Sequence, residues 1–271
     1  MKEGTVNVRE KEGVMMWSRV ELKQKAKDVL RGSYWKALLV SFVISIAAGG
    51  GRANGTRASK KDYGNVKDWY YNSPNTELLP MIVIIAGIIL LIVIAVAMTM
   101  RVFIGYNLEV GGRRYFIQGS QGDVNMGYLG HGFKKDRYLD IIKAMLLRDV
   151  LNFLWYFLLI IPGIVKSYAY SMVPYILADN PNIGYRRALE LSQQMTDGEK
   201  LDMWVLDLSF VGWYLLGSLA LGIGVFFVLP YDNATHGELY LVLRQKAIEN
   251  GICDYRELNL IRQLKQGTEI F

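Results

Sequence analysis

The chain has 271 residues, of which 52% are hydrophobic, and its mean hydropathy is positive, which is unusual for a water-soluble domain. Its single cysteine excludes a disulfide framework. Lys and Arg outnumber Asp and Glu by 31 to 25, but this excess lies in segments between apolar runs, where it indicates membrane topology and not nucleic-acid binding.

The first 33 residues are charged and contain one predicted helix. Residues 1–17 form a polar N-terminal extension, and Ser18 to Glu21 have the form of a capping box, which starts a helix. The residues that follow place apolar side chains on one face and lysines largely on the other. Two interpretations remain open: an interfacial helix that binds anionic lipid head groups, or an ordinary helix packed on the protein.

Apolar segments typical of membrane helices follow. The strongest is residues 78–104, which hold no charge between Glu77 and Arg101. This uncharged run is longer than the roughly 20 apolar residues that a membrane helix needs. We predict an all-α polytopic membrane helical bundle with amphipathic interfacial helices. It forms one integral membrane domain, residues 18–249, followed by a charged cytoplasmic tail, residues 250–271. About six transmembrane helices are expected, at residues 34–48, 78–104, 138–161, 163–178, 201–220 and 224–243.

Two long polar segments separate the first three predicted spans. Residues 49–78 contain many Gly, Asn, Ser and Lys residues and are interpreted as a flexible loop. Residues 105–137 are also rich in glycine and are interpreted as a polar loop with a helical part around residues 119–133. A further amphipathic helix is predicted over residues 182–200.

The segment from Ile160 to Pro181 indicates how the chain threads through the membrane. Two apolar runs are separated only by Pro162-Gly163, and the second run ends at an Asp-Asn-Pro signal that breaks helices. Proline lacks an amide donor, and glycine permits a left-handed turn. The pair therefore predicts a hairpin turn between two helices without a polar loop.

Lys and Arg are distributed unevenly among the predicted loops. With the N-terminus inside, the inner segments hold 21 of these residues and the outer segments hold five, all of them in residues 49–78. Because positively charged segments stay on the cytoplasmic side, we predict a multi-pass protein of the cell membrane with both termini in the cytoplasm. A five-span alternative would place the basic tail outside.

Ionisable residues inside the predicted spans are the main candidates for a functional site. Charges are costly in a bilayer and are normally paired or exposed to a wet cavity. We predict an intramembrane polar cluster of Arg148, Asp149 and Asp207. Asp207 is the expected partner of Arg148, because Asp149 points about 100° away from it on the same helix. Simple snorkelling or pinning of helices is the alternative.

No catalytic, cofactor-binding or metal site is predicted. The histidines, His131 and His236, lie in different segments, and neither is expected to have a carboxylate or cysteine at ligand spacing, which argues against zinc. The chain also lacks Gly-x-Ser-x-Gly, Gly-Lys-Ser/Thr and His-Glu-x-x-His motifs.

Several strings resemble one bacterial membrane protein family. RVELKQKAKDVLRGSYWKALLVSF, LLIIPGIVKSYAYSMVPYILADNP and LPYDNATHGELYLVL are similar to the integral membrane family catalogued as domain of unknown function 975, over about residues 16–245. The resemblance implies the same helical membrane architecture and carries no established activity. The hairpin with its following amphipathic helix is also similar to the membrane domain of some glycerophosphodiester phosphodiesterases, whose metal-binding domain has no counterpart here.

Two classes of function therefore remain. The chain is predicted to be non-enzymatic and to act as an envelope scaffold, accessory or regulatory module. Its expected partners are membrane lipids, with other membrane proteins as a further class, and no nucleic acid. The alternative is a transporter of a small solute or lipid that uses a polar site near Arg148 and Asp207. A cavity that contains these charges would favour the transporter.

Overall fold

The computed structural model describes residues 10–11, 14–15, 17–47, 79–219 and 224–260. Most of these residues are helical, and the strands β1 (Glu10–Lys11) and β2 (Val14–Met15) form a two-stranded antiparallel hairpin. The predicted all-α fold class is confirmed. The predicted loop 49–78, most of the N-terminal extension and the end of the charged tail lie outside the described residues.

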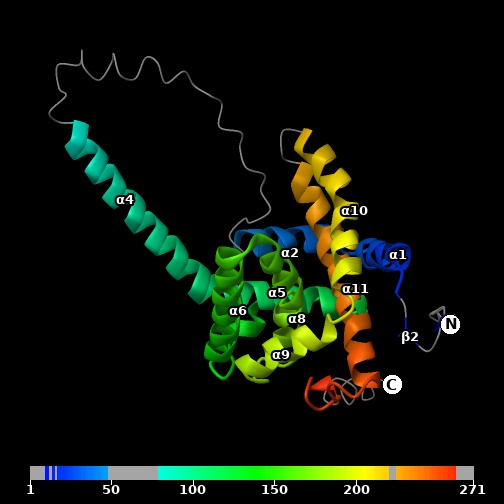
Figure 1. Cartoon of the computed structure of the whole chain (residues 1–271). Coiled ribbons are helices and arrows are strands. Elements are labelled where there is room, and N and C mark those ends of the chain that lie inside the picture. Colours follow the sequence, from blue (N-terminus) through cyan, green and yellow to red (C-terminus); the bar gives the residue numbers. More distant parts are fainter. Residues whose placement is uncertain (1–9, 12–13, 16, 48–78, 220–223, 261–271) are drawn as a thin grey trace.

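The helices vary in length from one short turn to seven turns (Figure 1). A π-helical turn, η1 (Arg101–Gly105), joins α4 to α5, and a 3-10 helix, η2 (Met126–Phe133), follows α5. The α-helices are α1 (Arg19–Leu30), α2 (Tyr34–Ala47), α4 (Leu79–Met100), α5 (Tyr106–Ser120), α6 (Tyr138–Leu158), α7 (Ile160–Ala169), α8 (Val173–Asp179), α9 (Tyr185–Met195), α10 (Lys200–Leu219) and α11 (Gly224–Glu249).

The buried core forms around α5 and α11. α5 packs against α2, α8, α11 and η2, and α11 also packs against α1 and α10. Val110 on α5, Ile176 on α8 and Leu239 on α11 are fully buried in this core. In contrast, α4 projects away from the other helices (Figure 1). The protein therefore has a packed body and one apolar helix outside it.

One helical segment among the described residues is long and apolar enough to cross a membrane. It is the continuous helix Pro80–Ser120, whose most apolar window is entirely unburied. A second candidate exists if α1 and α2, which meet at 110°, count as one broken span. The predicted bundle of about six spans is therefore not confirmed.

The predicted polar loop of residues 105–137 is wrong over its first half. That half forms α5, on which Val110 is fully buried. The glycines that resemble loop residues in the sequence are contact points in the structure. A Cβ atom at Gly111 would collide with the backbone of Leu129, so only glycine allows η2 to lie this close to α5.

The hairpin turn predicted at Pro162-Gly163 lies earlier in the chain. Leu159 has the extended conformation that separates α6 from α7, with φ −156° and ψ 137°. Pro162 lies in the first turn of α7, where a missing amide donor costs little. Gly163 is helical and not left-handed. A Cβ atom there would lie 2.6 Å from Cδ1 of Tyr156, so this glycine permits α6 and α7 to pack closely.

The predicted fourth span, residues 163–178, is broken in the structure. α7 ends at Ala169, and α8 begins at Val173 with Pro174 in its first turn. Pro174 has no amide hydrogen to donate to the carbonyl oxygen four residues earlier, so a continuous helix through this point would lose a hydrogen bond. The break places the residues between α7 and α8 along the wall of a cavity.

α1 packs on the body of the protein. Leu22 and Ala26 are buried, and the helix contacts α11. Nζ of Lys23 donates a hydrogen bond to Oγ of Ser209 at 2.7 Å and lies 4.2 Å from the ring centroid of Phe210. These contacts agree with the second interpretation of this segment, an ordinary helix packed on the protein.

Candidate functional site

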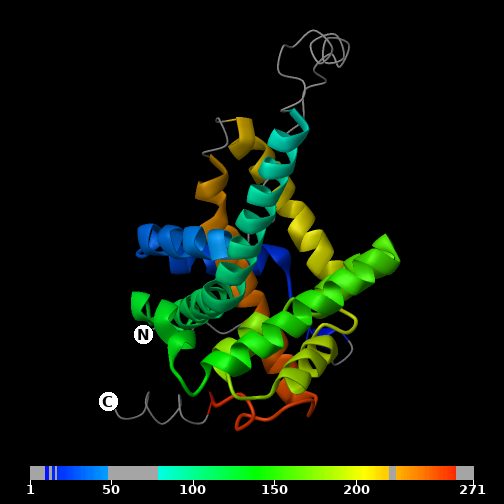
Figure 2. The ribbon, with the colours of Figure 1, turned by 90° about the vertical axis from the view of Figure 1, so that its left-hand side faces the viewer.

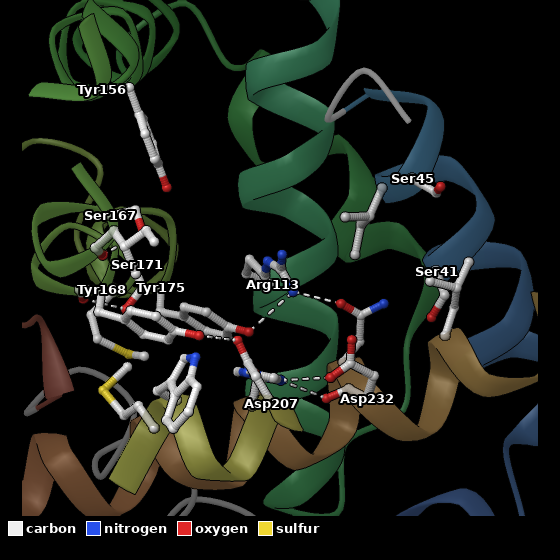
Figure 3. Close-up of a pocket in the computed structure, with 18 residues that line it drawn as sticks. Ser41, Ser45, Arg113, Tyr156, Ser167, Tyr168, Ser171, Tyr175, Asp207 and Asp232 are labelled. Atoms are coloured by element: carbon white, nitrogen blue, oxygen red, sulfur yellow. Dashed lines mark hydrogen bonds and ion pairs between the residues drawn. The ribbon is translucent and has the colours of Figure 1, made fainter. Parts of the chain in front are cut away.

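A cavity of about 490 Å³, partly open to the surface and lined by polar and apolar side chains, lies in the body of the protein. α2, α5, α6, α7, α8, α10 and α11 surround it, together with the segment between α7 and α8 (Figure 3). Ionised, hydroxyl and amide side chains share its wall with aromatic and aliphatic ones. The lining residues are Ser41, Ile44, Ser45, Arg113, Tyr156, Ile164, Ser167, Tyr168, Ser171, Met172, Tyr175, Met203, Trp204, Asp207, Leu229, Asp232, Asn233 and His236.

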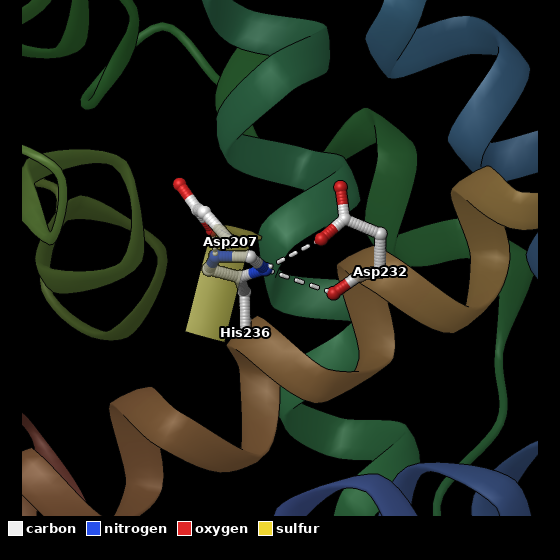
Figure 4. A group of neighbouring side chains, drawn as sticks. All are labelled: Asp207, Asp232 and His236. Atoms are coloured by element: carbon white, nitrogen blue, oxygen red, sulfur yellow. Dashed lines mark hydrogen bonds and ion pairs between the residues drawn. The ribbon is translucent and has the colours of Figure 1, made fainter. Parts of the chain in front are cut away.

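His236 lies between two carboxylates of this cavity (Figure 4). Nε2 of His236 lies 2.9 Å from Oδ1 of Asp207, and Nδ1 lies 3.0 Å from Oδ1 of Asp232. Nδ1 also lies 2.9 Å from the backbone carbonyl oxygen of Asp232. Because both ring nitrogens face acceptors, both carry a hydrogen in this arrangement. The ring is then a cation between two anions.

Two tyrosines orient the carboxylates from the side opposite the histidine. Tyr168 on α7 donates its hydroxyl hydrogen to Oδ2 of Asp207 at 2.8 Å. Tyr214 on α10 donates to Oδ2 of Asp232 at 2.6 Å. Each carboxylate thus has one oxygen toward a tyrosine and the other toward His236. This network connects α7, α10 and α11.

The sequence of α11 explains why Asp232 and His236 meet. They are four residues apart, so they lie on the same face of the helix. Their side chains are 6% and 17% exposed, and that of Asp207 is 21% exposed. The three residues are therefore removed from bulk solvent but open to the cavity. One oxygen or nitrogen ligand atom from each lies within 4.8 Å of the others, which is the composition and size of a metal-binding set.

Arg113 on α5 brings a second kind of charge to the cavity (Figure 3). Its Nη1 donates to Oδ1 of Asn233 at 2.6 Å and to the hydroxyl oxygen of Tyr175 at 3.1 Å. Its Nε is buried and has no hydrogen-bond partner in the part of the chain that the structure describes. A guanidinium whose hydrogen-bond partners in the cavity, Asn233 and Tyr175, are neutral groups suits an anionic guest.

The predicted polar cluster is divided between two places. Arg148 pairs with Asp149 at 2.9 Å and with Glu109 at 3.2 Å, whereas Asp207 lies beside His236 in the cavity. The expectation that Asp149 points too far from Arg148 to pair with it is wrong, because the long arginine side chain folds along the helix to the next residue. Arg148 therefore has two other partners in place of the predicted Asp207.

The cluster around Arg148 ties helices together. Asp149 also accepts hydrogen bonds from Nη2 of Arg101 at 3.0 Å and from the hydroxyl of Tyr106 at 2.9 Å. Its two arginines and two carboxylates balance to zero net charge. The network joins α6 to the junction of α4 and α5, and none of its members lines the cavity.

Two parts of the cavity are missed by sequence reasoning. The statement that no carboxylate stands at ligand spacing from His236 is wrong, because Asp232 precedes it by four residues in LPYDNATHGELY. That spacing is the signal that finds the pair. Arg113 falls in the predicted loop, and no local pattern places it near α10 or α11, so its position follows only from the tertiary fold.

Two titratable groups outside the cavity have displaced pKa values. Burial, helped by the positive charges of Arg114 and Arg137, lowers the pKa of His131 to about 3. Nη1 of Arg137 lies 3.2 Å from Nδ1 of His131, which suits a neutral ring that accepts a hydrogen bond. Burial also raises the pKa of the Cys253 thiol to about 11.

Comparison with known proteins gives one match. No curated protein and no solved structure matches the chain. A family model described as protein of unknown function (DUF975) matches residues 157–247. The matched segment runs from the end of α6 through most of α11 and so includes Tyr168, Asp207, Tyr214, Asp232 and His236. The resemblance predicted from the sequence is confirmed over this segment, which is similar to the DUF975 family.

Proposed function

We propose that the protein is a multi-pass membrane protein that binds a small polar solute in this cavity and carries it across the membrane. The observation that supports this most strongly is the position of Arg113, Asp207 and His236. These ionisable side chains line a cavity of about 490 Å³, a size typical of small-molecule sites. Charged groups inside a membrane protein commonly mark a solute or ion path.

The outer surface supports a membrane location. The large hydrophobic side chains of α4 from Met81 to Met100 are between 45% and 68% exposed. The end of α6 and the start of α7 expose Phe153, Phe157, Ile160 and Ile161, and the end of α10 exposes Leu216 and Leu219. The start of α4, the end of α10 and the start of α11 point to one side of the molecule, opposite α9 (Figures 1 and 2). Lipid is the environment that suits these surfaces.

Broken helices beside the cavity also support a transport role. Transporters bind their solutes near helix interruptions, because unwound backbone is tolerated in a membrane where it lines a cavity. Here the break between α7 and α8 places Ser171 and Met172 in the cavity wall. Oγ of Ser41, on the α2 side of the wall, is buried and has no hydrogen-bond partner among the described residues.

Solute binding can be tested with the purified protein in lipid nanodiscs. A panel of small carboxylates, amines and zwitterions is added, and the shift in melting temperature is recorded. At least one solute should stabilise the wild type and have little effect on Arg113→Gln or Asp207→Asn. Asp149→Asn is the matched control, because it removes a carboxylate of similar exposure that does not line the cavity. A positive solute is then tested for uptake into proteoliposomes.

The orientation predicted from Lys and Arg is part of the same proposal. Both termini should lie in the cytoplasm of a cell whose plasma membrane holds the protein. A reporter fused after Leu243 should be active only inside the cell. Activity of a reporter on the outer side of the membrane at this position would overturn the orientation.

A scaffold or regulatory module is the second candidate, and α4 favours it. Every described side chain from Pro80 to Met100 is exposed, so this helix has no partner within the described part of the chain. Small residues such as Gly87 leave room for a second helix, since nothing lies within 4 Å of its added Cβ. A photo-crosslinking residue at Ile88 should capture a partner protein if the scaffold hypothesis is correct, and only lipid if it is not.

A further inference from the structure

We propose that Asp207, Asp232 and His236 form a binding site for one divalent transition-metal ion, such as Mn²⁺, Co²⁺ or Zn²⁺. The proposal goes beyond solute binding and does not require it. It stands on the positions of three side chains and of the two tyrosines that orient them.

The donor atoms are close enough to share one ion. A carboxylate oxygen from each aspartate and a ring nitrogen of His236 all lie within 4.8 Å of one another. At ligand bonds of about 2.1 Å, two donors on opposite sides of one ion are about 4.2 Å apart. Small rotations of the side chains therefore bring all three atoms to bonding distance.

The surroundings hold the ligands in place. The hydroxyls of Tyr168 and Tyr214 each donate to the Oδ2 atom of one carboxylate, which leaves both Oδ1 atoms directed at His236. Hydrogen bonds from neighbouring groups to ligating carboxylates are a regular feature of metal sites, because they fix the orientation of the ligand. Five polar side chains thus form one pre-oriented set.

The backbone presents the ligands as helical metal sites do. Asp232 and His236 are separated by one helical turn, the same spacing that puts two ligands on one face in helical zinc motifs. Asp207 approaches from α10 and completes a set of three. Because all three line the cavity, further coordination positions remain open to water or to a solute.

Charge and donor type favour a transition metal. With a neutral imidazole, Asp207 and Asp232 bring two negative charges, which one divalent ion cancels. The ion would take the place of the hydrogen between Nε2 of His236 and Asp207. The Nδ1 hydrogen would keep its bond to the backbone carbonyl oxygen of Asp232, and Oδ1 of Asp232 would turn from Nδ1 to the ion. Mixed imidazole and carboxylate sets suit Mn²⁺, Co²⁺ and Zn²⁺, whereas Ca²⁺ and Mg²⁺ prefer oxygen ligands alone.

Co²⁺ is the probe that tests the site directly. The full-length protein in lipid nanodiscs is treated with a chelator and dialysed. Co²⁺ is then titrated in without any solute, and binding is followed by calorimetry and by the d–d absorption of the bound ion. One Co²⁺ per chain is expected. Asp207→Asn should weaken binding about 100-fold, and Tyr168→Phe, which changes only an orienting group, about 10-fold.

Asp149→Asn is the matched control, because its carboxylate belongs to the Arg148 cluster, and it should bind Co²⁺ as the wild type does. Equal affinity in the wild type and in Asp207→Asn would place the ion elsewhere and overturn the proposal. Absence of saturable binding to the wild type would also overturn it and leave a hydrogen-bonded Asp–His–Asp network. Neither result depends on whether a solute shifts the melting temperature.

A measurement on the wild type alone tests the same site even if the variants fail to fold. The chain has two histidines, so modification by diethyl pyrocarbonate can be assigned to each by mass spectrometry. Co²⁺ should slow the modification of His236 and leave the rate at His131 unchanged. The same rate at His236 with and without Co²⁺ would contradict a metal ligand at this position.

Discussion

The ring of His236 contacts Asp232 twice, through the Oδ1 atom at 3.0 Å and through the backbone carbonyl oxygen at 2.9 Å. The opposite nitrogen of the same ring reaches Asp207 on α10 at 2.9 Å. One side chain therefore connects two helices and separates two largely buried carboxylates. Replacing the His236 side chain should therefore lower the free energy of unfolding by more than the loss of its packing contacts alone.

His236→Ala should destabilise the protein by about 3–5 kcal/mol, the usual cost of breaking a buried charge network by removing one partner. The two aspartates would then face each other without a cation. Thermal unfolding in detergent, followed by circular dichroism, measures the effect. Lys135→Ala, at an exposed position, is the control and should melt as the wild type does. A wild-type melting temperature for His236→Ala would contradict the network.

Gly163→Ala should open the hairpin of α6 and α7. The added methyl group would lie 2.6 Å from Cδ1 and 2.9 Å from Cα of Tyr156, so backbone as well as side chain must move. Overpacking of this kind costs about 1–3 kcal/mol. Gly212→Ala on α10 is the matched control. Nothing lies within 4 Å of its Cβ, and alanine favours a helix, so this variant should be as stable as the wild type or slightly more stable.

Equal melting temperatures for the two glycine variants would show that α6 and α7 do not approach closely. Pro162→Ala separates the roles of the two residues. Pro162 lies in the first turn of α7, so its replacement should have a smaller effect than Gly163→Ala.

The sequence predicted helices best where a single pattern dominated. The span at 34–48 corresponds to α2, and 138–161 corresponds to α6 with the start of α7, because long apolar runs have one local interpretation. The prediction from the sequence failed at α5, where residues such as Glu109 and Gly111 are typical of a polar loop. Glu109 is buried beside Arg148 on α6 and Gly111 beside Leu129 on η2, and no local pattern contains this information.

The candidate site, too, could be predicted from the sequence only in part. Asp207 could be selected from the sequence because a carboxylate inside an apolar segment needs a partner. The identity of that partner could not, since it depends on how α10 and α11 are rotated about their axes. Arg148 shows the same limit: the prediction that it pairs is correct, but the partners are Asp149 and Glu109.

His131 should make the protein less stable as the pH falls. Its pKa in the folded protein is about 3, below the ordinary value of 6.5, so the unfolded chain binds more protons between these two values. The contribution of the neutral ring is complete above pH 6.5 and is lost as the pH falls toward 3. Unfolding measured at pH 7 and pH 5 should show a smaller loss of stability in His131→Gln than in the wild type. The same loss in both would contradict a buried neutral histidine.

Cys253 should react slowly with iodoacetamide in the folded protein. The thiolate is the reactive form, and burial raises the pKa of this thiol from 9.0 to about 11. At pH 8 this difference lowers the thiolate population about 100-fold. Labelling followed by mass spectrometry compares the folded protein with protein unfolded in detergent, without background because the chain has one cysteine.

Arg187 donates to Glu257 and to the carbonyl oxygen of Ile252 and holds this turn, so Arg187→Ala should speed up labelling toward the unfolded rate. Equal rates in folded and unfolded wild type would show that the segment after α11 does not shield the thiol.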